Sequence, residues 1–147
     1  MPSRPPWEDQ GAWKKMANRA DGILLDSSVV IAHLRGKLDL FAITLPAEEL
    51  YIPLFVLGEL RKGAIKSGAP PRNHALIDGL LKLVAVIDPD SATAEVYAKI
   101  AADLERAGTP IPENDIWIAA VALELDMPLA TRDAHFSRIP SLTLLVW

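Results

Sequence analysis

The sequence predicts an α/β fold in which a mainly parallel sheet of four to five strands carries helices on both faces. Short apolar runs that suit buried strands alternate with longer segments of helical spacing along the chain. Hydrophobic residues make up 50% of the 147 positions, which is enough to fill the core of one compact domain. Because strands and helices alternate, we expect parallel pairing with right-handed crossovers.

The first predicted strand is the apolar run 23–25, and it leads through a serine cap into a helix that reaches Leu34. Asp26 follows the strand directly, and the hydroxyl residues Ser27 and Ser28 come next. In an open parallel sheet, ligands bind beyond the carboxyl ends of the strands. Asp26 is therefore expected at a ligand-binding edge.

The next segment is predicted to contain a helical stretch over 38–49, interrupted at Pro46, and then a short strand over 50–53. Helical spacing resumes over 55–66, where Glu59 lies about one turn beyond the strand. Glu59 is thus placed near the same edge as Asp26.

Beyond a Gly and Pro break, the pattern predicts a helix around 76–84 and a third strand over 84–87. The segment 91–107 is predicted to be a helix that is capped by Ser91 and stopped by Gly108.

The last third carries two more acids at comparable places. A helix over 113–125 has Asp115 in its first turn and is apolar almost all round, so we expect it to be buried by the sheet and by a second subunit. A fourth strand over 127–130 precedes Asp133, and a last strand is expected over 142–147.

The first 21 residues differ from the rest. They contain several prolines, two tryptophans and mixed charges without a strand pattern. We expect residues 1–21 to form an amino-terminal extension that is flexible or packs on the domain or a partner, and residues 22–147 to form the domain.

The composition excludes several classes of function. There is no cysteine, so disulfides, thiolate metal sites and a cysteine nucleophile are ruled out. No apolar run approaches a membrane span, and the composition suits the cytoplasm. A net charge of −4 disfavours nucleic acid binding unless a basic patch or a metal offsets phosphate repulsion.

The four acids Asp26, Glu59, Asp115 and Asp133 are predicted to meet at one edge of the sheet. Carboxylates brought that close repel one another unless a cation neutralises them. Oxygen ligands without sulfur favour Mg²⁺ or Mn²⁺ over Zn²⁺, and the three histidines show no paired zinc spacing. His135 lies close to Asp133, and we expect it to be a surface or supporting residue rather than a ligand.

Each acid also has an ordinary structural explanation. These are a helix cap for Asp26, an ion pair with Arg61 or Lys62 for Glu59, stabilisation by the helix dipole for Asp115, and a turn for Asp133. These separate explanations account less well for the expected gathering of all four acids at one edge of the sheet.

Four ordered segments carry the acids: Asp26 lies in LLDSSVVIA, Glu59 in VLGELRKGA, Asp115 in IPENDIWIAAVALE and Asp133 in LATRDAHFSRIPSL. Together these segments resemble the PIN-domain family, and within it the VapC-type toxins of prokaryotic toxin–antitoxin pairs. The resemblance covers residues 22–147. The long segment before Gly22 departs from the family, whose members usually begin almost at the first strand.

The resemblance implies a PIN-like three-layer α/β/α sandwich and a metal-dependent endoribonuclease. Asp26, Asp115 and Asp133 would hold Mg²⁺, with Mn²⁺ as a substitute, and Glu59 would be a ligand or would orient water. Ser28 and Thr131 match the hydroxyl positions that order such sites. The implied partners are RNA, a VapB-type antitoxin and a second copy of the chain in a homodimer.

Basic residues near the acids are candidates for holding the RNA backbone. They are Arg35, Arg61, Lys62, Lys66, Arg132 and Arg138.

Three alternatives stay open at the level of sequence. The first is a non-catalytic PIN domain that acts as an RNA- or protein-binding module. The second is a receiver-like domain with Asp26 as phosphate acceptor, which is weakened because no second acid stands two residues later. The third is a structure-specific DNA nuclease, for which the chain lacks basic segments that would grip a duplex.

Overall fold

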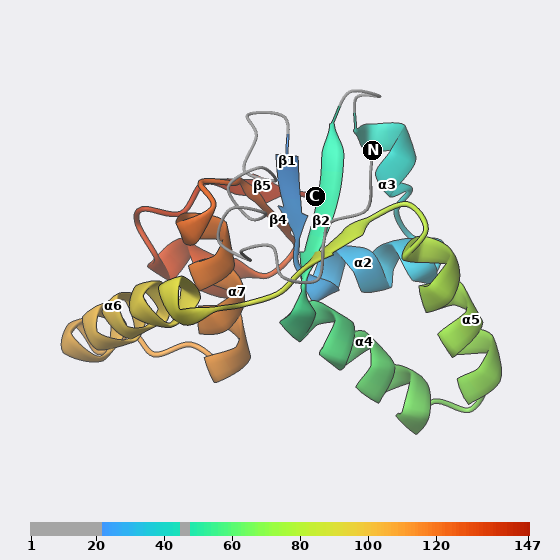
Figure 1. Cartoon of the computed structure of the whole chain (residues 1–147), viewed down its shortest axis with the longest axis horizontal. Helices are drawn as coiled ribbons and strands as arrows, with labels where there is room; N and C mark the ends of the chain where they lie inside the picture. The colour runs from blue at the N-terminus through green and yellow to red at the C-terminus, as the bar shows by residue number, and fades with distance from the viewer. Residues whose placement is uncertain (1–21, 45–47) are drawn as a thin grey trace, which may run out of the picture.

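The computed structural model describes residues 22–44 and 48–147, which form a five-stranded sheet flanked by helices (Figure 1). The strand order is β3-β2-β1-β4-β5, and every neighbouring pair is parallel. The strands are β1 (Gly22–Leu25), β2 (Glu49–Pro53), β3 (Ala85–Ile87), β4 (Leu129–Thr131) and β5 (Leu144–Val146). The predicted fold class is confirmed.

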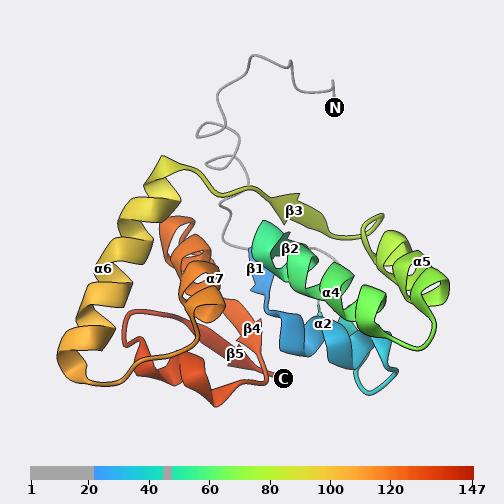
Figure 2. The ribbon, with the colours of Figure 1, turned by 90° about the horizontal axis from the view of Figure 1, so that it is seen from below.

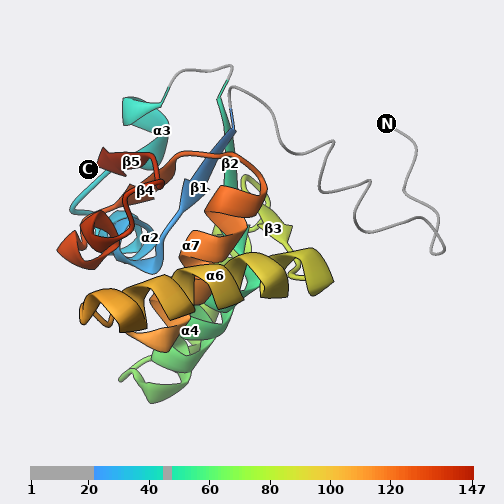
Figure 3. The same ribbon diagram turned by 90° about the vertical axis from the view of Figure 1, so that its left-hand side faces the viewer.

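Helices lie on both sides of the sheet. They are α2 (Ser27–Leu34), α3 (Leu40–Ile43), α4 (Leu54–Lys66), α5 (Pro70–Leu80), α6 (Ser91–Ala107), α7 (Glu113–Glu124) and the short 3₁₀ helix η1 (Ala134–Arg138). Two pairs pack closely, α6 with α7 and α4 with α5, and the strands lie between these pairs (Figure 2). In Figure 3, α3 and α7 lie on opposite sides of β1.

Strand β1 is the centre of the sheet and is buried along its whole length. It pairs with β2 through Ile23 opposite Leu50, and with β4 through Leu25 opposite Ala130. The chain builds β2 and β3 on one side of β1 and then crosses to build β4 and β5 on the other. The carboxyl ends of β1 and β4 thus form the switch point where open α/β sheets bind ligands.

The apolar helix α7 fills the space between the sheet and α6. Residues 118–122 are fully buried inside the monomer. The prediction that several sides of this helix are covered is therefore confirmed, but α6 and the sheet supply the cover. The apolar character of α7 needs no second subunit, and the homodimer stays a prediction.

The predicted helical stretch over 38–49 is wrong. Helix α3 is only the segment Leu40–Ile43, capped by Asp39, and Thr44 already has extended backbone angles. Glu49 belongs to β2, while residues 1–21 and Pro46 lie outside the described residues. A short apolar segment between two polar ones fits a single turn as well as a longer helix, so spacing alone could not set its length.

Two predicted caps are also displaced by one position. The acids Asp26 and Asp90, rather than the serines that follow them, cap α2 and α6. Gly108 ends α6 in the left-handed conformation with φ 67°, as predicted for a glycine stop. The fourth strand starts at Leu129 instead of Met127, because residues 125–127 complete the turn after α7.

Among the described residues, no helix combines the length and the apolar character that crossing a membrane would require.

Candidate active site

The four predicted acids come from different elements that converge at the carboxyl edge of the sheet. Asp26 follows β1 and Asp133 follows β4, while Glu59 lies in α4 and Asp115 in the first turn of α7. Glu59 is tied to the sequence neighbours of Asp26 and Asp115, since it accepts hydrogen bonds from Ser27 and Asn114.

Asp26 is held by the fold at the closed end of the site. Only 2% of the residue is exposed. Its Oδ1 accepts hydrogen bonds from the backbone N–H of Ser27 at 2.7 Å and from the Ser27 hydroxyl at 3.3 Å. Its Oδ2 accepts from the hydroxyls of Ser28 and Thr131, each at 2.8 Å. The buried carboxylate thus has three donors of its own, and the single proton of the Ser27 hydroxyl is shared with the closer Glu59. Asp26 also caps α2, which confirms the structural explanation for this acid.

The same two hydroxyls order the loop after β4. Ser28 accepts a hydrogen bond from the backbone N–H of Arg132 at 2.9 Å, and Thr131 accepts one from Asp133 at the same distance. The predicted supporting hydroxyls therefore connect Asp26 to the backbone that carries Asp133.

Glu59 is fixed by two polar neighbours. Ser27 donates a hydrogen bond to its Oε2 at 2.9 Å, and the side-chain amide of Asn114 donates to Oε1. The proposed ion pair with Arg61 is wrong, because the Arg61 guanidinium pairs with Asp78 at 2.6 Å. The carboxylate of Glu59 consequently stays with the acidic site instead of the outer face of α4.

Asp115 and Asp133 lie together with a histidine. Nδ1 of His135 is 3.4 Å from Oδ2 of Asp115 and 3.0 Å from Oδ1 of Asp133. Asp133 also caps η1 by accepting a hydrogen bond from the backbone N–H of His135 at 3.0 Å, so its role in a turn is confirmed. Asp115 from α7 and the pair Asp133 and His135 from η1 therefore lie side by side in this part of the site.

The surroundings of Asp115 disfavour the charged form of its carboxyl group. Burial, followed by the charges of Asp26 and Asp133, raises the pKa of Asp115 from 3.8 to about 6, although its contact with His135 lowers it. This carboxylate is close to half protonated near pH 6 and would lose its proton readily to a bound cation.

The donors fit a divalent cation. Among residues 22–44 and 48–147, one group of possible ligands has its atoms within 4.8 Å of one another, namely Asp115, Asp133 and His135. Carboxylate oxygens suit Mg²⁺ and Mn²⁺. Asp26 and Glu59 lie outside this group, although the charges of both act on Asp115.

An aromatic stack aligns the helices that carry the acids. Trp117 of α7 stacks on Tyr97 of α6, with ring centroids 3.9 Å apart, and on Phe55 of α4 at 5.5 Å. Phe55 lies one helical turn before Glu59, and Trp117 lies two residues after Asp115. The stack therefore helps to set the spacing between α4 and α7.

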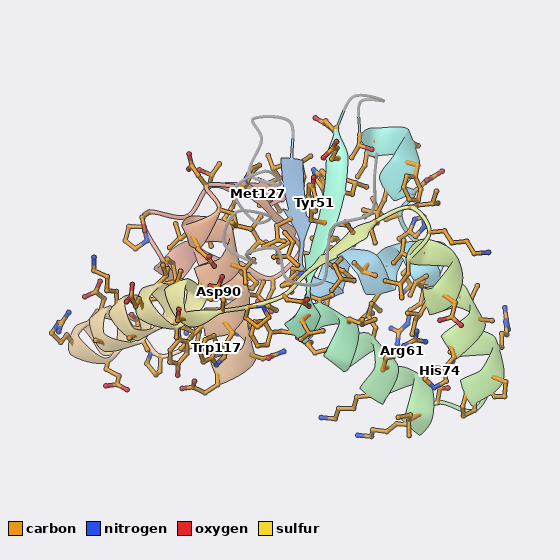
Figure 4. All side chains as sticks on the ribbon, in the orientation of Figure 1. Tyr51, Arg61, His74, Asp90, Trp117 and Met127 are labelled. Carbon is orange, nitrogen blue, oxygen red and sulfur yellow. The ribbon has the colours of Figure 1, made fainter. Side chains whose placement is uncertain are left out.

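The predicted basic residues fall in different places. Arg35 lies with Glu59 on a cavity of about 180 Å³ between α2, α4 and α5. Arg132 is exposed on the loop between Thr131 and Asp133. Figure 4 shows Arg61 and His74 facing each other between α4 and α5, away from α7, and the two side chains are in contact at 3.0 Å.

The remaining candidates are Lys62 and Lys66, which are exposed on α4, and Arg138, whose guanidinium donates to the carbonyl of Pro110 at 2.8 Å. The part of the chain that the structure describes does not bring all these cations into one cluster around the acids.

The sequence analysis does not identify two residues that hold the site. Ser27 and Asn114 each adjoin a predicted acid and support Glu59, and adjacency to the acids is the available signal. His135, expected to be a surface or supporting residue, has its Nδ1 facing both Asp115 and Asp133.

The comparisons with known proteins all indicate the same family. Residues 23–142 match the PIN domain. A tRNA(fMet)-specific endonuclease VapC from Salmonella typhimurium is 32% identical over 127 residues, which cover 84% of this chain and 96% of the relative. A ribonuclease VapC1 from Haemophilus influenzae is 31% identical over 129 residues, with the same coverage of 84% and 96%.

Solved structures agree in fold. VapBC2 from Rickettsia felis bound to a promoter DNA fragment matches with a TM-score of 0.81 at 27% identity, over 86% of this chain and 98% of that chain. DNA-bound VapBC from Salmonella typhimurium matches with a TM-score of 0.80 at 31% identity, again over 86% and 98%. With the family match spanning most of the sequence and its acids meeting at the switch point of the sheet, the chain belongs to the PIN domain family.

Proposed function

We propose that this chain is a metal-dependent endoribonuclease and the toxin of a type II toxin–antitoxin pair. It would hydrolyse RNA phosphodiester bonds with Mg²⁺, for which Mn²⁺ can substitute. The relatives named as VapC ribonucleases support the reaction class, and the neighbouring structures are complexes of the VapBC type.

The observation that carries the proposal is the placement of four acids at one sheet edge, where the polar contacts that the described residues make to them include no lysine or arginine side chain. Burial, and after it the negative charges of Asp26 and Asp133, raises the pKa of Asp115. The guanidinium of Arg61 in α4 is paired with Asp78 and does not offset this charge.

Asp26, Asp115 and Asp133 would hold the cation, with Glu59 as a further ligand or as the group that orients water. When bound, the cation lowers the pKa of water and stabilises charge that develops on the scissile phosphate. The backbone N–H of Ser27 and the hydroxyls of Ser28 and Thr131 keep the Asp26 carboxylate in one orientation. Ser27 and Asn114 do the same for Glu59, so neither acid has to reorganise during the reaction.

The proposed partners are RNA, a VapB-type antitoxin and a second copy of the chain, and the proposed location is the cytoplasm. Arg35 and Arg132 are the basic residues best placed for RNA, because one lines the cavity beside Glu59 and the other adjoins Asp133. The assignment of residues 22–147 as the domain and 1–21 as an extension stays a prediction.

The test is cleavage of a total RNA preparation by the purified full chain with Mg²⁺, with Mn²⁺ and with EDTA, beside Asp26→Asn and Asp115→Asn. We expect discrete fragments that require the metal and disappear in both variants. Parental cleavage by Asp26→Asn would contradict the metal assignment. Binding of Mn²⁺ without cleavage of any RNA would favour a non-catalytic PIN module.

A further inference from the structure

The ring of His135 presents a buried nitrogen to the acidic site. Although 42% of the side chain is exposed, Nδ1 is itself buried, and within the described part of the chain it has no hydrogen-bond partner. Buried polar atoms are nearly always paired, because burial without a partner is costly. Nδ1 of His135 therefore needs a bonding partner that the described residues do not supply.

The distances around Nδ1 match those between ligands of one ion. Metal–ligand bonds of about 2.1 Å at right angles place neighbouring ligand atoms roughly 3 Å apart. Nδ1 lies 3.0 Å from Oδ1 of Asp133 and 3.4 Å from Oδ2 of Asp115. Nδ1 thus faces two carboxylate oxygens at once, and neither forms a well-aligned hydrogen bond with it.

The local structure holds the ring in this position. Asp133 caps η1 through the backbone N–H of His135, and the next residue, Phe136, is completely buried. The 3₁₀ turn is thus anchored on both sides of His135, and η1 packs against α7, which carries Asp115. The ring is presented by a fixed turn rather than by a free loop.

We propose that His135 is a metal ligand, with Nδ1 completing a mixed nitrogen and oxygen site together with Asp115 and Asp133. The inference rests on the proposed function for the presence of a cation at the acids. Mg²⁺ strongly prefers oxygen ligands, whereas imidazole nitrogen suits transition metals. His135 would therefore make the site bind Mn²⁺ more tightly than Mg²⁺, and it takes a role closer to the metal than the sequence suggested.

The competing explanation is a protonated His135 that pairs with both carboxylates. It accounts for the same two distances, and the sign of the charge is reasonable for an acidic site. The two explanations differ once Mn²⁺ is present, since a ligand is bonded to the ion through nitrogen and an ion-pair partner is displaced by it.

The experiment uses the full chain with Mn²⁺ as the probe. Pulsed electron paramagnetic resonance detects a nitrogen bonded to Mn²⁺, and protein labelled with ¹⁵N-histidine identifies that nitrogen as histidine. We expect a histidine coupling in the wild type that is lost in His135→Gln. Calorimetric titration should show Mn²⁺ affinity reduced about ten-fold or more in that variant, with a smaller change for Mg²⁺.

His74→Gln is the matched control, because it removes a half-buried imidazole that contacts Arg61 outside the acidic site. It should keep the nitrogen coupling and the affinity. Mn²⁺ bound to the wild type without histidine coupling would overturn the inference and leave the nuclease proposal standing. Failure of the wild type to bind Mn²⁺ would overturn both. If His135→Gln does not fold, the isotope comparison in wild-type protein decides.

Discussion

The two halves of the acidic site hold their negative charge in different ways. In the inner half, Asp26 is 2% exposed and accepts hydrogen bonds from one backbone N–H and the hydroxyls of Ser28 and Thr131. In the outer half, the Asp115 side chain is 15% exposed, and the described residues give it no hydroxyl or backbone donor. Its nearest polar contact is the ring of His135.

Asp26 and Asp115 therefore differ in whether their negative charge stabilises the folded protein. The fold compensates Asp26, so that acid stabilises the protein as well as the site. The fold does not compensate Asp115, whose pKa is raised by burial and by its neighbours, so that acid weakens the protein without a cation. The inner half fixes the geometry, and the outer half carries the charge that binding a metal would relieve.

The largest expected effect follows from removing the compensated charge. Asp26→Ala should lower the free energy of unfolding by about 3 kcal/mol, because it removes a helix cap and leaves buried hydroxyl donors without an acceptor. Urea unfolding of the metal-free protein measures this loss.

Asp39→Ala is the control for that measurement. Asp39 caps α3 through a hydrogen bond to the backbone N–H of Phe41 at 3.1 Å, in an exposed position. Its removal should cost about 1 kcal/mol or less. Equal losses in the two variants would show that the inner half contributes nothing beyond its cap.

Removing the uncompensated charge of Asp115 should instead stabilise the metal-free protein. We expect Asp115→Asn to increase the free energy of unfolding of the metal-free protein at pH 7.5 by about 1–2 kcal/mol. The full pKa shift corresponds to roughly 3 kcal/mol, and solvent at the partly exposed carboxylate reduces that value. Urea unfolding with EDTA measures the gain.

The pH dependence of that gain gives an independent check. An acid with a raised pKa leaves stability intact below its unfolded value of 3.8 and reduces it as the pH rises through about 6. The advantage of Asp115→Asn should therefore be complete above pH 7 and shrink toward zero as the pH falls to about 4. A gain that does not vary with pH would contradict the assigned cause.

The same contrast explains what the sequence could predict. Asp26, Asp115 and Asp133 were placed correctly because strand ends and helix starts follow from local spacing, and parallel strands end at one edge. The donors to Asp26 span up to 105 positions along the chain, from Thr131, so no local pattern reveals them. The position of the His135 ring between two acids could not be predicted, because a 3₁₀ turn of five residues has no distinctive period in sequence.

Thr131 tests the connection between the halves. Its hydroxyl donates to Asp26 and accepts from the backbone N–H of Asp133, so Thr131→Val should reduce the free energy of unfolding by about 1 kcal/mol. The rate of RNA cleavage should fall about ten-fold, since both acids lose a support. Thr143→Val changes an exposed threonine of similar shape and should leave both quantities unchanged.

The smallest expected effect concerns Arg132, which lies between Thr131 and Asp133 where the two halves join. Arg132→Gln should weaken RNA binding several-fold. It should also make the slope of the logarithm of the binding constant against the logarithm of the salt concentration less steep by about 0.7, the value for one contact with a single-strand phosphate. Fluorescence anisotropy with labelled RNA at several salt concentrations measures both, in a cleavage-deficient Asp115→Asn background.

Arg61→Gln is the comparison variant, because the Arg61 guanidinium is already paired with Asp78 and contacts His74. It should leave the affinity for RNA and its salt dependence unchanged. The reverse result, a loss with Arg61→Gln and none with Arg132→Gln, would place the RNA across α4 and α5. The junction of the two halves would then position the metal alone, and the substrate would approach from the side of Glu59.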